Sequence, residues 1–157
     1  MDATHTIEPR IPNVARTVPE AMQALIALGK AASMGGVPPT THMLVHLRAS
    51  QINGCSFCVD MHSRELRDAG ESDERIWGVA AWRESPFFDD AERAALALAE
   101  AGTRLSDSQD PVPDEVWEEA ARQYDEAELA SLVLSITVIN AWNRLNVITR
   151  QPAAPRT

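Results

Sequence analysis

Residues 125–149 read DEAELASLVLSITVINAWNRLNVIT, and this stretch decides the fold class. The β-branched residues between Leu129 and Ile139 would suit a strand, but the length of the stretch and its alanines favour a helix. Asp125 and Glu128 have the spacing of a capping box, which marks the start of a helix. The stretch therefore predicts one long helix that is buried on most sides.

The rest of the chain has the same helical character, because no segment sustains a strict alternation of apolar and polar residues. Prolines and glycines fall mainly between the periodic segments, where they would end helices. Asp89 and Glu92 repeat the capping-box spacing. The predicted class is all-α, with about seven helices. Their approximate ranges are Pro19–Met34, Thr41–Ile52, Cys55 to just before Gly70, Asp73–Arg83, Asp89–Gly102, Pro113–Tyr124 and Asp125–Thr149.

The length of 157 residues corresponds to one domain, which we expect over residues 18–150. Residues 1–17 are predicted to form an extended arm, because Pro9 and Pro12 oppose regular structure there. Residues 151–157 would be a short tail. We find no repeat and no linker that would divide the chain further.

The charge balance argues against two classes of partner. The chain has 14 basic and 23 acidic residues and a net charge of −9, so it lacks the basic face that nucleic acids or anionic membranes require. The longest nearly apolar stretch, Leu129–Trp142, is too short to span a bilayer. No signal peptide is visible at the N-terminus. We therefore expect a cytoplasmic protein, where a close cysteine pair is typically redox-active or metal-binding.

The sharpest local feature is the pair of cysteines in Cys55-Ser56-Phe57-Cys58, followed by His62. If a helix starts here, the two thiols and the imidazole share one helix face. Both thiols would lie at the helix N-terminus, where the dipole lowers a thiol pKa. The spacing allows a disulfide, and His62 could exchange a proton with Cys58. These are the parts of a dithiol redox centre.

Two alternatives remain open for these residues. Two cysteines and a histidine are also zinc ligands, and His42 or His46 on the preceding helix could supply a fourth, although structural zinc sites usually contain two separated ligand pairs. The cysteines could instead be inert and packed as small apolar side chains. In residues 140–144, polar side chains interrupt an apolar helix, and we expect them to form a buried network or a subunit contact.

Three blocks of sequence resemble one known family. Residues 47–62, LRASQINGCSFCVDMH, are similar to the core of the carboxymuconolactone decarboxylase family in its alkylhydroperoxidase (AhpD)-like branch. Residues 80–86, AAWRESP, and 140–144, NAWNR, resemble the same branch. The resemblance spans about residues 20–150. It implies an AhpD-like helical fold that assembles into homo-oligomers, commonly trimers or hexamers.

The resemblance also implies an antioxidant activity, the reduction of hydroperoxides by a thiol pair. Cys58 matches the cysteine that attacks the peroxide, Cys55 the resolving cysteine and His62 the histidine of the proton relay. The electrons would come from a dithiol reductant such as a lipoyl-bearing protein. No cofactor and no metal are implied.

The chain departs from the family pattern at one position. The relay usually includes a glutamate twelve residues before the first cysteine, and this chain has Met43 there. His46, one turn later, is a hypothetical substitute. General acid–base help is typically worth about 100- to 10,000-fold, so a missing carboxylate would reduce turnover.

Two further functions follow from this departure and from the family name. The chain could be a weakly active or non-catalytic oligomer that responds to redox state or binds a ligand. It could also decarboxylate a carboxymuconolactone, although that reaction offers no obvious use for Cys55 and Cys58.

Overall fold

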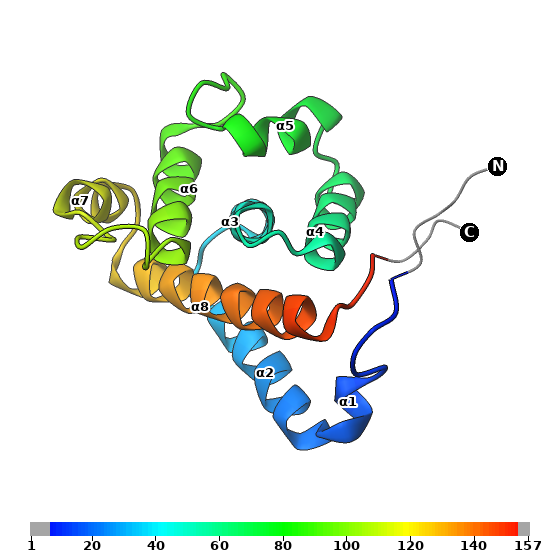
Figure 1. The fold of residues 1–157 in the computed structure, drawn as a ribbon. Helices are drawn as coiled ribbons and strands as arrows, with labels where there is room; N and C mark the ends of the chain where they lie inside the picture. Colours follow the sequence, from blue (N-terminus) through cyan, green and yellow to red (C-terminus); the bar gives the residue numbers. More distant parts are fainter. Residues whose placement is uncertain (1–6, 154–157) are drawn as a thin grey trace.

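The computed structural model describes residues 7–153 and contains, within that range, eight α-helices, one short 3-10 helix and no strand (Figure 1). The predicted all-α class is therefore confirmed. The elements are α1 Val14–Thr17, α2 Pro19–Ala32, α3 Pro39–Ile52, α4 Ser56–Asp68, α5 Asp73–Gly78, the 3-10 helix η1 Val79–Ala81, α6 Asp90–Thr103, α7 Asp114–Gln123 and α8 Glu126–Thr149. Each of the seven predicted helices corresponds to one of the helices α2 to α8.

Two local predictions need correction. The predicted extended arm contains α1, because the side chain of Asn13 accepts a hydrogen bond from the N–H of Arg16 and caps a single helical turn; residues 1–6 of the arm lie outside the described range. The predicted helix Asp73–Arg83 stops at Gly78 and continues as the tighter turn η1. Val79 in this turn and Trp82 just after it are buried, whereas Trp77 of α5 is exposed.

Both predicted capping boxes are present. At the start of α8, the Asp125 carboxylate accepts from the N–H of Glu128 at 2.9 Å, and the Glu128 carboxylate accepts from the N–H of Asp125 at 2.8 Å. Asp89 and Glu92 form the same box on α6. An N-cap of this kind stabilises a helix by about 1 kcal/mol. Local sequence thus determines where the two helices that flank the core begin.

Helix α3 lies at the centre of the fold. It packs against α4, α6 and α8, and Figure 1 shows it end-on within a ring formed by these helices and α5. One apolar cluster on α3 includes Val45 and joins it to α6, α7 and α8. A second includes Leu44 and Leu47 and joins it to α4, η1 and α6. A third, smaller cluster contains Cys55 and Cys58.

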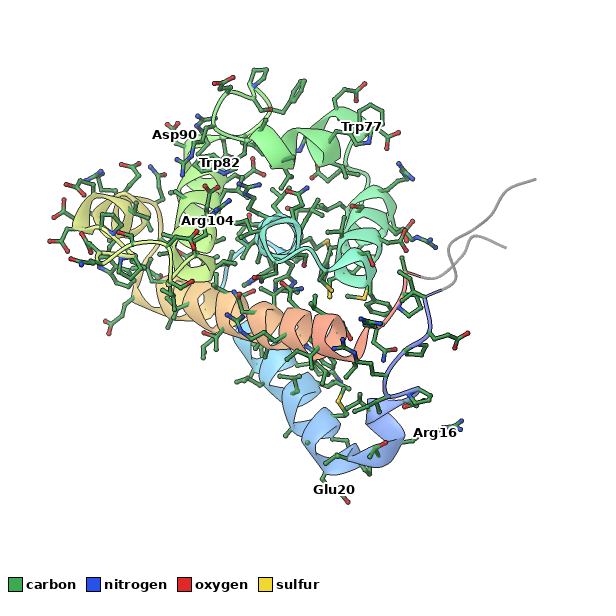
Figure 2. All side chains as sticks on the ribbon, in the orientation of Figure 1. Arg16, Glu20, Trp77, Trp82, Asp90 and Arg104 are labelled. Atoms are coloured by element: carbon green, nitrogen blue, oxygen red, sulfur yellow. The ribbon has the colours of Figure 1, made fainter. Side chains whose placement is uncertain are left out.

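Helix α2 lies on the other side of α8 from α3 and extends outward to α1 (Figure 1). Figure 2 shows Arg16 and Glu20 at the corner where α1 meets α2, directed away from the body. After α2, Gly35 lies so close to α8 that a Cβ atom would come within 2.7 Å of the Ala127 carbonyl oxygen. Among residues 7–153, no helix is both long enough and apolar enough to cross a membrane.

Candidate active site

The turn between α3 and α4 places Cys55 at the start of α4. Gly54 has a φ of +65°, a conformation that favours glycine. Cys55 follows as the N-cap residue, with extended backbone, and its sulfur accepts a hydrogen bond from the N–H of Cys58 at 3.4 Å. The predicted helix start at the cysteine pair is therefore confirmed.

Both cysteines are free thiols and both are buried, with 2% of Cys55 and 1% of Cys58 exposed. They pack beside Ala49 of α3 and Ile139 of α8. From α8, the side-chain amide of Asn146 donates a hydrogen bond to the Cys58 sulfur at 3.3 Å. Three helices therefore enclose the pair.

The two thiols differ in their electrostatics. The Cys58 thiol donates a hydrogen bond to the Cys55 sulfur, and this bond, helped by the N–H of Cys58 and by Asn143 and Asn146, lowers the pKa of Cys55 to about 6 against the effect of burial. The same bond and burial raise the pKa of Cys58. The two shifts thus have opposite directions, and the hydrogen bond between the sulfurs favours negative charge on Cys55 over Cys58. The helix N-terminus was expected to lower the pKa of both thiols. The pKa of Cys55 is lowered as expected, but that of Cys58 is raised because its thiol is the hydrogen-bond donor.

His62 is one turn after Cys58 on α4, and only 5% of it is exposed. Its Nδ1 lies 2.7 Å from a carboxylate oxygen of Glu65. Its Nε2 is buried and has no hydrogen-bond partner among the residues that the structure describes. One ring nitrogen is thus held by a carboxylate, and the other is available to a ligand.

His46 extends from α3 to the same place. Its ring centroid lies 4.9 Å from that of His62, and its Nε2 lies 2.7 Å from the Ser135 hydroxyl of α8. Burial, followed by the nearby His62 and His42, lowers the pKa of His46 to about 3. His46 is therefore neutral at physiological pH and acts through hydrogen bonds and not through a stable positive charge.

The Ser135 hydroxyl links His46 to His42, whose Nδ1 lies 3.0 Å from the same oxygen. The two histidines that could have joined a zinc site are thus bound to a serine. Within residues 7–153, no group of three or more histidine, cysteine, aspartate or glutamate side chains could hold a metal ion.

A cavity of about 420 Å³ brings three of the four predicted site residues together. Cys58, His62 and His46 all line it, while Cys55 does not. The rest of its wall is mainly apolar and consists of Gly29, Phe57, Met61, Val138, Ile139 and Trp142, together with Asn146. A ligand in this cavity would meet one thiol and two imidazoles in apolar surroundings.

A second hollow, of about 590 Å³, reaches Cys55 from another direction. Its wall includes the polar side chains of Glu8, Ser56, Asn146 and Arg150. It is larger than the first cavity, but neither histidine lines it. Acid–base chemistry at sulfur is therefore possible in the apolar cavity and has no support from imidazole in the polar one.

The polar residues of α8 form the buried network that the sequence predicts. The Asn53 amide donates to the side-chain oxygens of Asn140 and Asn143, in both cases at 2.9 Å. Asn143 in turn donates to Ser50 at 3.0 Å. This network joins α8 to the end of α3 and so fixes the turn that carries Cys55.

Three residues at the site were not identified from the sequence, and Met43 does not take part. Glu65 has the helical spacing i, i+3 from His62, so a local signal existed. Ser135 and Asn146 reach the site only through packing of α8, which no local pattern reveals. Met43 packs against the apolar cluster of Leu44 and Leu47 and does not line the cavity.

Comparisons with known proteins show which proteins this chain resembles. Residues 19–101 match the model of the carboxymuconolactone decarboxylase family. The chain is 38% identical to the uncharacterized protein YdfG of Bacillus subtilis, over 88% of this chain and 92% of that protein. It is 42% identical to the alkyl hydroperoxide reductase AhpD of Methylocella silvestris, but over only 51% of this chain and 42% of the relative.

A crystal structure with the same fold comes from Agrobacterium tumefaciens. It superimposes with a TM-score of 0.89 and 36% sequence identity, and the match covers 95% of this chain and all of that one. That protein is of unknown function, and a role in antioxidant defence of the AhpD type has been suggested for it. The similarity thus includes α8, which lies beyond the residues that match the family model.

Proposed function

The chain belongs to the carboxymuconolactone decarboxylase family, and from this premise we propose that it is a thiol-dependent peroxidase that reduces hydroperoxides at Cys58. One observation carries the proposal: Cys58, His62 and His46 line a single apolar cavity, and Cys55 is the N-cap residue three positions before Cys58 on the same helix. This arrangement supplies a sulfur nucleophile, a base and a second sulfur that is ready to react.

In the first step, His62 accepts the Cys58 proton on Nε2, and the Cys58 thiolate attacks the terminal oxygen of the hydroperoxide. The O–O bond breaks, an S–OH bond forms, and His62 returns its proton to the departing alkoxide, which leaves as an alcohol. His46, which stays neutral, orients the peroxide by a hydrogen bond. Cys58 is then a sulfenic acid.

In the second step, the Cys55 thiolate attacks the Cys58 sulfur. An S–S bond forms, the S–O bond breaks, and hydroxide leaves as water after it takes a proton from solution. The low pKa of Cys55 favours this step, because a thiolate is the reactive form of the resolving cysteine.

In the third step, an external dithiol reduces the disulfide. Its thiolate attacks Cys58, Cys55 leaves as the more stable thiolate, and the second thiol of the reductant displaces Cys58 and closes its own disulfide. Burial of both sulfurs favours a dithiol on a slender arm, such as a lipoyl group, over a bulky donor. We also propose a cytoplasmic location, where such a dithiol donor would keep the pair in its thiol form.

We also propose that the protein is a homo-oligomer, either a trimer or a hexamer. Large apolar side chains are exposed on and after α2 and along α8, and burial of such side chains is a common reason for assembly. These residues are Ile26, Leu28, Met34, Val133, Leu134, Val147 and Ile148. Light scattering of the purified protein measures the number of subunits, and a monomer at micromolar concentration would contradict this part of the proposal.

Met43 favours a second candidate, a redox-responsive protein with little turnover. A side chain that packs in an apolar cluster cannot replace the expected relay carboxylate. In this case Cys55 and Cys58 would still form a disulfide, but peroxide reduction would be slow.

The test is the consumption of an organic hydroperoxide with dihydrolipoamide as the electron donor. We expect turnover by the wild type and none by Cys58→Ser. Cys55→Ser should react once and then stop, because the sulfenic acid on Cys58 has no thiol to resolve it and can be trapped chemically. A wild-type rate no higher than that of Cys58→Ser would refute the peroxidase. Disulfide formation without turnover would favour the redox-responsive protein.

A further inference from the structure

Glu65 occupies a position that the proposed mechanism leaves unexplained. It follows His62 by three residues on α4, and its carboxylate oxygen lies 2.7 Å from His62 Nδ1. The hydrogen bond from His62 holds the pKa of Glu65 below its usual value, even though burial acts in the opposite direction. Glu65 is therefore an ionised acceptor at neutral pH.

This hydrogen bond determines which nitrogen of His62 carries the proton. An ionised carboxylate can only accept, so Nδ1 must be the N–H of the neutral ring. Nε2 is then the nitrogen with the free lone pair. It is also the atom that is buried without a partner in the described part of the chain, and the ring lines the cavity beside Cys58.

Glu65 could provide the carboxylate that is absent at position 43. The upstream residue where a carboxylate was expected is Met43, whose side chain packs in an apolar cluster. Cys58, His62 and Glu65 are spaced by four and then three residues on one helix, so the thiol, the imidazole and the carboxylate lie along one face of α4.

We propose that Glu65 is the positioning residue of the site: it fixes His62 with Nδ1 protonated and Nε2 directed at the cavity, and it supplies from α4 the carboxylate that Met43 cannot supply from α3. The role of the resulting proton carrier in catalysis rests on the proposed peroxidase function. The orientation and tautomer of His62 do not, and they can be measured independently.

The first experiment is nitrogen NMR of the histidine side chains in the full-length reduced protein, with His62 assigned from a His62→Gln variant. The wild type should show His62 with a pyrrole-type Nδ1 and a pyridine-type Nε2. Glu65→Gln should keep this tautomer, because the amide oxygen still accepts, while Glu65→Ala should lose it. The control is Asp68→Ala, which removes an exposed carboxylate from the same helix.

The second experiment measures peroxide reduction by the same variants. Glu65→Ala should lower kcat by about tenfold or more, since general acid–base help is worth about 100- to 10,000-fold and a misplaced imidazole forfeits part of it. Asp68→Ala should match the wild type. In a His62→Ala background, Glu65→Ala should have no further effect, because Glu65 acts through His62.

Each result separates the two proposals. If His62 has the same tautomer in Glu65→Ala as in the wild type, or if Glu65→Ala lowers kcat no more than Asp68→Ala, the positioning role is wrong. Additive losses in the His62→Ala background would also overturn it. If the wild type reduces no hydroperoxide but its His62 tautomer depends on Glu65, the positioning role stands and the peroxidase function fails.

Discussion

The side-chain amide of Asn146 donates a hydrogen bond to the sulfur of Cys58 across 3.3 Å, although the two residues are 88 positions apart in the sequence. Asn146 comes from the last turns of α8, and Cys58 from the first turn of α4. The bond favours the charged form of Cys58 and so opposes the rise in the pKa of that thiol. α8 thus contributes to the electrostatic environment of a thiol on another helix.

Asn146→Ala should slow hydroperoxide reduction. A hydrogen bond to a charged group contributes about 1.5–3 kcal/mol, which corresponds to a loss of about 10- to 150-fold if the bond acts on the Cys58 thiolate. Steady-state kinetics with a saturating dithiol donor would measure this loss. Thr137→Ala, which truncates an exposed side chain of the same helix, is the control, and equal rates for the two variants would exclude a role for the bond.

The thiol pair should give a characteristic pH profile in the reduced protein. Because the pKa of Cys55 is about 6, the rate of alkylation by iodoacetamide should rise with a midpoint near pH 6. In Cys55→Ser, where only Cys58 remains, the midpoint should move to more alkaline pH. A wild-type midpoint near 9, the ordinary value for a thiol, would show that Cys55 is not activated.

The same shift determines how stability depends on pH. Between about pH 6 and pH 9, the unfolded Cys55 thiol binds a proton that the native one has released, so the free energy of unfolding rises with pH. Cys58 has the opposite sign: its pKa is raised in the native state, so its contribution is lost above the ordinary thiol pKa. Urea denaturation should therefore show that the advantage of the reduced wild type over Cys55→Ser grows from pH 6 to pH 9.

Ser135→Ala should destabilise the protein by about 1–3 kcal/mol, because it leaves buried nitrogens of His42 and His46 without their shared partner. Equilibrium unfolding in urea measures this cost. Thr137→Ala is the matched control on α8, since its exposed hydroxyl bonds only to the Val133 carbonyl of its own helix. If both variants unfold at the same urea concentration, the serine does not hold the two histidines.

Met43→Glu should bring no large gain in rate. The carboxylate that serves His62 is already present as Glu65, so the increase should stay well below the factor of about 100 that general acid–base help typically gives. The new charge would enter an apolar cluster and lower the free energy of unfolding by about 1–3 kcal/mol. Met43→Gln is the control for shape. A large gain with Glu and none with Gln would instead indicate a decayed relay.

Much of the fold could be predicted because its signals are local. The capping boxes at Asp89 and Asp125 and the glycine after Asn53 mark helix ends within a few residues of the chain. The switch from α5 to η1 could not be predicted in this way. Val79 and Trp82 are buried in an apolar cluster with residues of other helices, and local spacing does not reveal such contacts.

The candidate site, like the fold, could be predicted only as far as local spacing determines it. The spacing of Cys55, Cys58 and His62 placed them on one helix, and the structure adds that His46 lines the same cavity as Cys58 and His62. The opposite pKa shifts of the two cysteines depend on which thiol donates to the other, and spacing does not contain that information.

Gly35 allows the chain after α2 to lie close against α8, near the cavity. Because the backbone there lies almost directly on α8, α2 is braced at its C-terminal end, while Gly29 of the same helix lines the cavity. A side chain at position 35 would collide with Ser131 and with the Ala127 carbonyl oxygen of α8, without touching a sulfur or an imidazole. The spacing between α2 and α8, and with it the shape of the cavity, therefore depends on a residue that takes no part in the chemistry.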